Sequence, residues 1–103
     1  MGKVFDVGDV YFRVTFGDPG LLYPKIESFV YVGQNLSPED REATWYFQFA
    51  DSYAKFGSVL ETEAGDRRMV LVPSSELSDM IDIAALSAML AQAADRRRKV
   101  RKI

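Results

Sequence analysis

The sequence predicts an α+β domain: an antiparallel sheet of four to five strands, a long C-terminal helix packed on one face, and one or two short helices in the connections. Three observations predict this fold. Apolar residues alternate strictly in the first third of the chain, turn residues separate successive alternating segments, and one long segment near the C-terminus has a helical apolar stripe. We expect one domain over residues 1–95 and a basic tail over residues 96–103 that continues the last helix.

The size and composition agree with a single folded domain. A chain of 103 residues can bury one hydrophobic core, and its hydrophobic (48%) and charged (27%) fractions are those of ordinary globular proteins.

The first two strands are predicted from alternation and from the turn between them. Residues 10–16 place four apolar side chains on one face: Val10, Phe12, Val14 and Phe16. A type II turn follows, with Pro19 setting φ and Gly20 taking a positive φ. Residues 26–33 alternate again, which predicts an antiparallel partner for the first strand.

The middle of the chain predicts a third strand between two short helical segments. Ser37 can cap a single helical turn that begins at Pro38. Residues 44–49 alternate with one entirely aromatic face, formed by Trp45, Phe47 and Phe49. Residues 50–57 fit either a strand extension or a short helix; Asp51 as the cap and Gly57 beyond the end favour the helix.

The last elements are a strand and the long helix. Residues 58–62 are a candidate strand before a turn at Glu63–Asp66. Residues 68–72 are apolar after Arg68 up to Pro73, which suits a central or doubly covered strand. Asp79 or Asp82 can cap a helix running to about Lys99. Its apolar stripe consists of Ile83, Leu86, Leu90 and Ala93.

The composition excludes many chemistries. The chain contains no cysteine and no histidine, so thiolate nucleophiles, disulfides, cysteine zinc sites and imidazole bases are all absent. Ser52 and Lys55 have the Ser-x-x-Lys spacing of β-lactamases, but the companion Ser-Asp-Asn and Lys-Thr-Gly elements are missing, so we expect helix surface there. We predict no catalytic residue, no cofactor and no metal, and therefore a protein that is not an enzyme.

Acidic clusters and glycines add no binding motif. The clusters lie beside turns and helix starts, where carboxylates cap helices and aid solubility. None has calcium-loop spacing, and no glycine-rich phosphate loop is present. The clusters are Glu39, Asp40 and Glu42; Glu61, Glu63 and Asp66; and Asp79 and Asp82.

The location expected from the sequence is cytoplasmic. The N-terminal segment has no apolar stretch of signal-peptide length. The most apolar segment, residues 83–94, is shorter than the roughly 20 residues that a membrane-spanning helix needs. We therefore expect no membrane span.

Charge is distributed unevenly along the chain. Residues 1–95 hold all 15 acidic and 7 of the 13 basic residues, whereas the tail holds the other six bases: Arg96, Arg97, Arg98, Lys99, Arg101 and Lys102. Such a tail can bind nucleic acid, an acidic protein or an anionic membrane. It can equally complement the carbonyl groups at a helix end, or fold back on the acidic body.

Aromatic residues suggest a partner surface. One helix cannot cover both faces of a sheet this rich in rings, so some rings must contact loops, a short helix or another molecule. The candidate partner-binding rings are Tyr31, Trp45, Tyr46 and Tyr53, together with the basic tail. The sequence thus predicts a non-enzymatic protein-binding or self-associating module, with a nucleic-acid accessory protein using the tail as the alternative.

Overall fold

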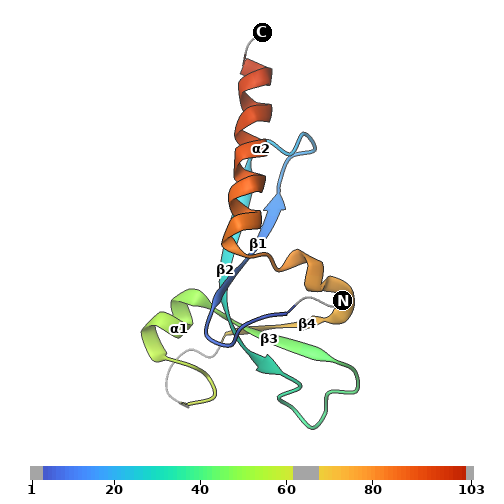
Figure 1. Cartoon of the computed structure of the whole chain (residues 1–103), viewed down its shortest axis with the longest axis vertical. Coiled ribbons are helices and arrows are strands. Elements are labelled where there is room, and N and C mark those ends of the chain that lie inside the picture. Colours follow the sequence, from blue (N-terminus) through green and yellow to red (C-terminus); the bar gives the residue numbers. More distant parts are fainter. Residues whose placement is uncertain (1–3, 62–67, 102–103) are drawn as a thin grey trace.

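The chain forms a curled four-stranded antiparallel sheet from which the C-terminal helix projects (Figure 1). This computed structural model describes residues 4–61 and 68–101. Its elements are β1 (Val10–Phe16), β2 (Pro24–Gln34), β3 (Thr44–Phe49), α1 (Ala50–Phe56), β4 (Met69–Pro73), the 3-10 helix η1 (Ser74–Asp79) and α2 (Ile83–Arg101). The strands lie in the order β1-β2-β3-β4. The predicted α+β class is confirmed.

The β1–β2 hairpin is longer than the rest of the sheet. β1 pairs with residues 24–30 of β2, with Tyr11 opposite Phe29 and Val14 opposite Ile26. β3 pairs only with the second part of β2, from Phe29 onward. The outer part of the hairpin therefore extends beyond the four-stranded region.

Segments of this chain cover both faces of the four-stranded region. On one face, η1 contributes Leu77 to the larger core, and the N-terminal segment packs against this core. Its Phe5 ring lies edge-on to the rings of Tyr11 and Phe47. On the other face, Val59 and Tyr53 pack with Val32 and Tyr46 in a smaller core beneath α1. The larger core contains seven buried residues: Tyr11, Phe29, Tyr31, Phe47, Val72, Leu77 and Met80.

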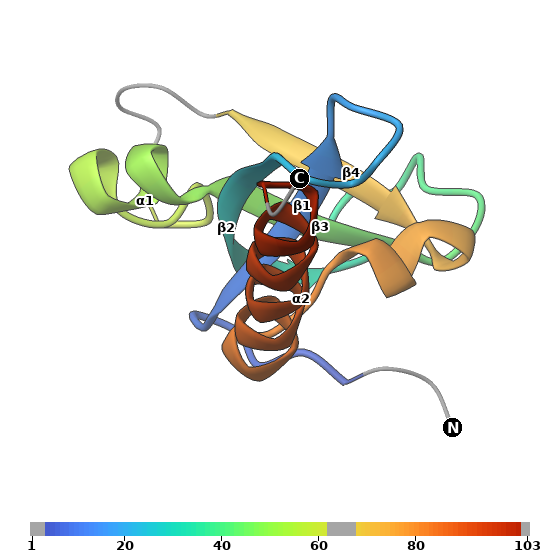
Figure 2. The same cartoon turned by 90° about the horizontal axis from the view of Figure 1, so that it is seen from above.

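α2 packs along the projecting hairpin, and its main contacts are with β1. Seen from above, α2 lies next to β1 and β2, with α1 and η1 on opposite sides of it (Figure 2). A pair of backbone hydrogen bonds between Phe12 and Ile81, each 2.8 Å, fixes the base of the helix to β1. α2 thus covers the hairpin, whereas α1, η1 and loops cover the four-stranded region of the sheet.

The turn between β1 and β2 differs from the predicted type II turn. Gly20 does not adopt a positive φ; the left-handed residue is Leu21, with φ of 57°. The Asp18 carboxylate accepts hydrogen bonds from the N–H groups of Leu22 (2.8 Å) and Tyr23 (3.0 Å). These two hydrogen bonds fix the backbone of Leu22 and Tyr23 relative to Asp18, and they stabilise a turn with Leu21 in the left-handed region, which the sequence pattern did not predict.

Two of the three predicted helical segments are present, with one change of cap. The helix alternative for residues 50–57 is confirmed, and Gly57 follows α1 with φ of 80°, but Phe49 is the N-cap and Asp51 lies in the first turn. Asp82 caps α2, because its Oδ1 accepts the N–H of Ala85 at 2.9 Å. α2 continues to Arg101, slightly past the predicted end.

Three further predictions are wrong. β4 is an edge strand rather than a central or doubly covered one, and Leu71 is 51% exposed. Residues 58–61 form a turn, closed by the Glu61 N–H on the Ser58 carbonyl, instead of a strand. Residues 37–40 form a hydrogen-bonded turn without a helix, and η1 was not predicted. The turn predicted at Glu63–Asp66 lies outside the described residues.

Candidate functional site

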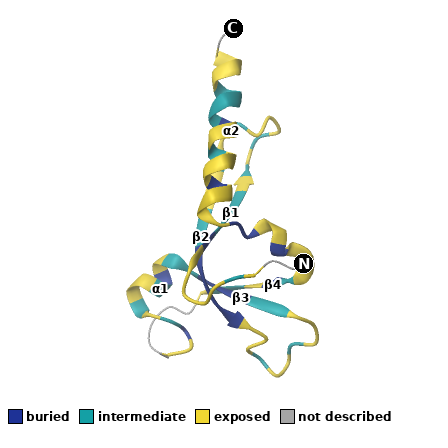
Figure 3. Cartoon of the chain, viewed as in Figure 1, coloured by how far each residue is buried: buried dark blue, intermediate teal, exposed yellow. Residues whose placement is uncertain are grey.

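The arm, meaning α2 together with residues 12–28 of the hairpin, is the principal exposed feature of the fold. Leu86 and Ala93 are the buried residues of α2, and they lie on the side that faces the hairpin. At about 100° per residue, the opposite side of residues 83–94 carries four uncharged residues that are all exposed, and Asp95 continues this side at its C-terminal end. Figure 3 shows that much of the α2 surface is exposed. We call the four uncharged residues the outer face of α2: Ala84, Ala88, Ala91 and Gln92.

Two residues of the predicted basic tail hold the arm together. Arg96 Nε donates to the carbonyl of Leu21 at 2.8 Å, and Arg97 donates to the carbonyl of Leu22 at 2.6 Å. The Arg96 guanidinium also lies over the Phe16 ring, 5.7 Å from its centroid. These cations therefore act inside the chain, on the loop whose backbone Asp18 also holds.

The other cations of the tail lie at the exposed end of α2. Arg98 and Lys99 pair with Asp95 at 3.2 and 3.1 Å, one helical turn away. The hydrogen bond from Lys99, followed by that from Arg98, lowers the pKa of Asp95. Arg101 is exposed, whereas Lys102 lies outside the described residues. Exposed pairs of this kind contribute little stability, so these groups can exchange partners readily.

The predicted aromatic surface is mostly core. Tyr31 is 6% and Tyr46 5% exposed, so neither ring can anchor a partner. Trp45 packs partly buried on the larger core and Tyr53 on the smaller one. The Tyr46 hydroxyl donates to Asp40 Oδ2 at 2.7 Å, and this bond raises the pKa of Tyr46. The sequence pattern could not show that loops and α1 would cover these rings.

One ring outside the predicted set is exposed. Tyr23 is 65% exposed, at the tip of the arm and next to Pro24, the first residue of β2. Its position directly after a turn was the only signal in the sequence, and turns are generally exposed.

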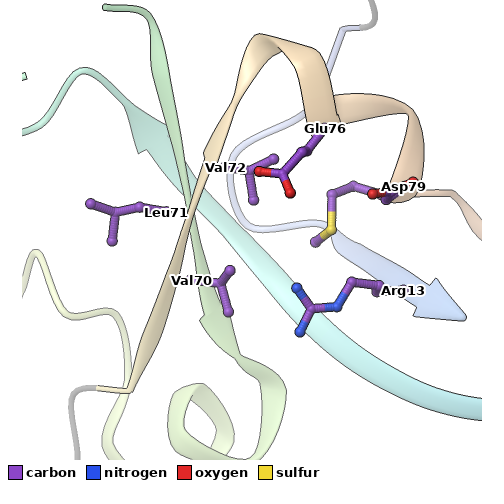
Figure 4. A pocket seen from close by; sticks show the side chains of 7 residues that line it. Arg13, Val70, Leu71, Val72, Glu76 and Asp79 are labelled. Carbon is purple, nitrogen blue, oxygen red and sulfur yellow. The ribbon is translucent and has the colours of Figure 1, made fainter. Parts of the chain in front are cut away.

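A pocket of about 230 Å³ lies between β4, η1 and β1 (Figure 4). Val70, Val72 and Met80 supply its apolar lining, and Glu76 and Asp79 approach from η1. Arg13 enters from β1; its charge is paired with Glu27 at 3.0 Å, and it lies 5.2 Å from the Phe29 ring centroid. Two carboxylates and one guanidinium line the pocket, so it can hold a small polar or charged group.

The Ser-x-x-Lys pair does not form a site. Ser52 is buried and its Oγ accepts a hydrogen bond from Gln48 Nε2 at 3.2 Å. Lys55 is exposed, with its amine over the Phe56 ring. We expected both residues on the helix surface, but the Ser52 side chain is buried, whereas Lys55 is exposed to solvent.

Two kinds of feature are absent from residues 4–61 and 68–101. In these ranges no three acidic side chains are grouped so that they could hold a metal ion. No helix within them is both long enough and apolar enough to cross a bilayer.

Comparison with known protein families, curated proteins and solved structures gives no match to this chain.

Proposed function

We propose that this chain is a non-enzymatic, cytoplasmic protein-interaction module that contacts its partner through the outer face of α2. One observation carries the proposal. Residues 83–94 contain no charged side chain, yet 8 of these 12 residues are exposed on a helix that projects from the body. A helix face exposed to water normally carries charged residues, and contiguous uncharged surface marks interaction sites.

The flanks of this surface are apolar. Ile83 is 63% and Met89 39% exposed, on the two sides of the outer face. Burying such side chains against a partner gains about 25 cal/mol per Å² of apolar area. The small alanines between them let a second helix approach closely. The surface is thus suited to a helical or flat partner and offers no deep pocket.

The covered sheet supports the same assignment. Tyr31 and Tyr46 are used in the two cores, and Trp45 and Tyr53 pack against those cores. The binding surface that the ring-rich sequence suggested on the sheet is therefore better placed on the helix, which the chain leaves largely uncovered on one side.

The test introduces one charge on the outer face. Ala88→Glu should preserve the helical circular dichroism spectrum, because the position is exposed. It should weaken at least tenfold the binding of any protein that the chain captures from cell extract, itself included. Ala54→Glu is the matched control, since Ala54 is an exposed residue of α1. Equal binding by wild type and Ala88→Glu would refute the proposal.

A nucleic-acid accessory role is the competing outcome of the same experiment. The variant for it is Arg98→Ala, Lys99→Ala and Arg101→Ala, which leaves Arg96 and Arg97 on the hairpin loop. If the wild type binds DNA or RNA with a steep salt dependence that this variant loses, phosphate contacts dominate and the tail is the functional surface.

A further inference from the structure

We infer that the partner of the α2 outer face is the same face of a second copy of this chain, with the two helices antiparallel. This inference rests on the proposed function and adds the identity and orientation of the partner. It is carried by the order of charges along the arm.

The two ends of α2 carry opposite charges. Asp79 and Asp82 are exposed just before the helix, and Arg98, Lys99 and Arg101 are exposed at its end. Asp82 and Arg101 are separated by about 28 Å at 1.5 Å per residue. This exceeds the Debye length of about 8 Å at physiological salt, so the two ends cannot neutralise each other within one copy.

An antiparallel pair brings these ends together. The acidic start of each helix then lies beside the basic end of the other, whereas a parallel pair would place like charges side by side. The helix dipoles favour the same arrangement, because each positive N-terminus lies beside a negative C-terminus. Charge therefore selects a second copy and its direction.

The outer face also gives a register. Ala84, Ala88 and Ala91 recur at intervals of four and three residues, the spacing at which helices pack side by side. With Ala88 of one copy level with Ala91 of the other, Asp82 of each copy lies level with residues 97–98 of the other. Asp79 precedes α2 and ends η1, so it adds to the acidic charge near the helix start without a helical register of its own.

The shape of the molecule permits this pairing. The chain measures 55 × 32 × 21 Å, with a radius of gyration of 16.1 Å, against about 13 Å for a compact domain of 100 residues. The excess length is the arm, which extends away from the sheet body (Figure 1). In an antiparallel pair the arms overlap and the two acidic bodies lie at opposite ends. Such a contact is small, so we expect a dissociation constant of about micromolar order.

The first experiment is disulfide crosslinking. Because the chain has no cysteine of its own, only the introduced cysteines can form a disulfide. In the register above, Ala84 lies level with Asp95 of the second copy and about 16 Å along the axis from the second Ala84. Mixed Ala84→Cys and Asp95→Cys chains should therefore crosslink, and Ala84→Cys alone should not. Ala54→Cys on α1 is the control and should stay monomeric. Strong crosslinking of Ala84→Cys to itself would indicate parallel helices and overturn the inference.

The second experiment measures self-association by sedimentation velocity from about 5 to 500 µM. Asp79→Lys alone and Arg101→Glu alone should each weaken self-association several-fold, and an equimolar mixture should recover it. Both substitutions spare the Asp82 cap, and circular dichroism checks the fold of each variant. Self-association that Ala88→Glu does not reduce would overturn the inference.

The two proposals fail in different ways. A wild-type chain that stays monomeric at 500 µM, yet captures another protein in an Ala88-dependent manner, would overturn self-pairing and leave the interaction role of α2 standing. A monomer without any Ala88-dependent binding would overturn both.

Discussion

At the scale of single residues, Gln48 connects three parts of the fold. Its side chain is fully buried in β3. Nε2 donates to Ser52 Oγ and to the Gly57 carbonyl at 3.1 Å, and Oε1 accepts the Val59 N–H at 3.0 Å. A buried amide with every hydrogen bond satisfied fixes α1 and the following loop against the sheet.

We predict that Gln48→Leu lowers the free energy of unfolding by about 2–4 kcal/mol, because the buried Ser52 hydroxyl and the buried Val59 N–H each lose a hydrogen bond, at about 1–3 kcal/mol each. Urea denaturation measures the loss. Gln34→Leu, at an exposed position of β2, is the control and should change stability by at most about 0.5 kcal/mol. Equal effects of the two substitutions would contradict this role of Gln48.

Asp18 is a second residue whose side chain organises backbone. The hydrogen bond from the Leu22 N–H is the largest cause that lowers its pKa below the ordinary value of 3.8, and the Arg96 charge contributes less. A carboxylate with a lowered pKa in the folded state contributes stability above its unfolded pKa. That contribution is lost as pH falls through the folded pKa.

We predict accordingly that Asp18→Asn destabilises the chain at pH 6 and that the difference from wild type narrows as pH falls below the ordinary carboxyl pKa of 3.8. Unfolding curves between pH 6 and pH 2.5 provide the measurement. Asp79→Asn, which removes an exposed carboxylate outside this loop, is the comparison for the change in net charge. A difference that stays constant across this range would rule out the role of the Asp18 charge.

At the scale of elements, the C-terminal end of α2 and the β1–β2 loop hold each other. Leu21 has a left-handed backbone, which costs a non-glycine residue about 1–2 kcal/mol. The carbonyls of Leu21 and Leu22 accept Arg96 and Arg97, while Asp18 accepts the next N–H groups. The strained turn is therefore stabilised from both sides, and its conformation depends on the helix end.

We predict that Arg97→Ala speeds amide hydrogen exchange in the last two turns of α2 and in residues 20–23, and leaves β3 unchanged. The reason is that the removed side chain donates to the Leu22 carbonyl across the arm. Arg98→Ala is the matched control, since Arg98 pairs only locally with Asp95 among the described contacts. Uniform acceleration through the sheet would show that the arm and body open together.

At the scale of the whole molecule, the bounds of helices and strands were more predictable than which segment would cover each of their surfaces. The bounds of β1 and β3 follow from alternation, because the side-chain period of a strand is two residues. The predicted stripe of α2 correctly included the buried Leu86 and Ala93, but its first member, Ile83, is 63% exposed. The stripe also did not show that the hairpin would bury it. A stripe specifies an apolar neighbour without identifying it.

The candidate site was predictable in part for the same reason. The basic residues after Asp95 and the uncharged stretch before it are visible in the sequence, but their roles depend on distant segments. Arg97 becomes structural because a loop 75 residues earlier lies beside it. Tyr31 and Tyr46 become core because α1 and the N-terminal segment cover opposite faces, and no periodicity encodes that coverage.

The contact between Arg97 and the hairpin loop, 75 residues apart, also orders events during synthesis. The four strands pair only with neighbours in sequence, so the meander can assemble progressively as it leaves the ribosome. The hairpin emerges long before α2. Its apolar face, formed by Phe12, Val14 and Phe16, therefore stays exposed to solvent until the last turns of α2 have been translated. Ribosome-bound chains that end before α2 should therefore be the form of this protein that most needs a chaperone.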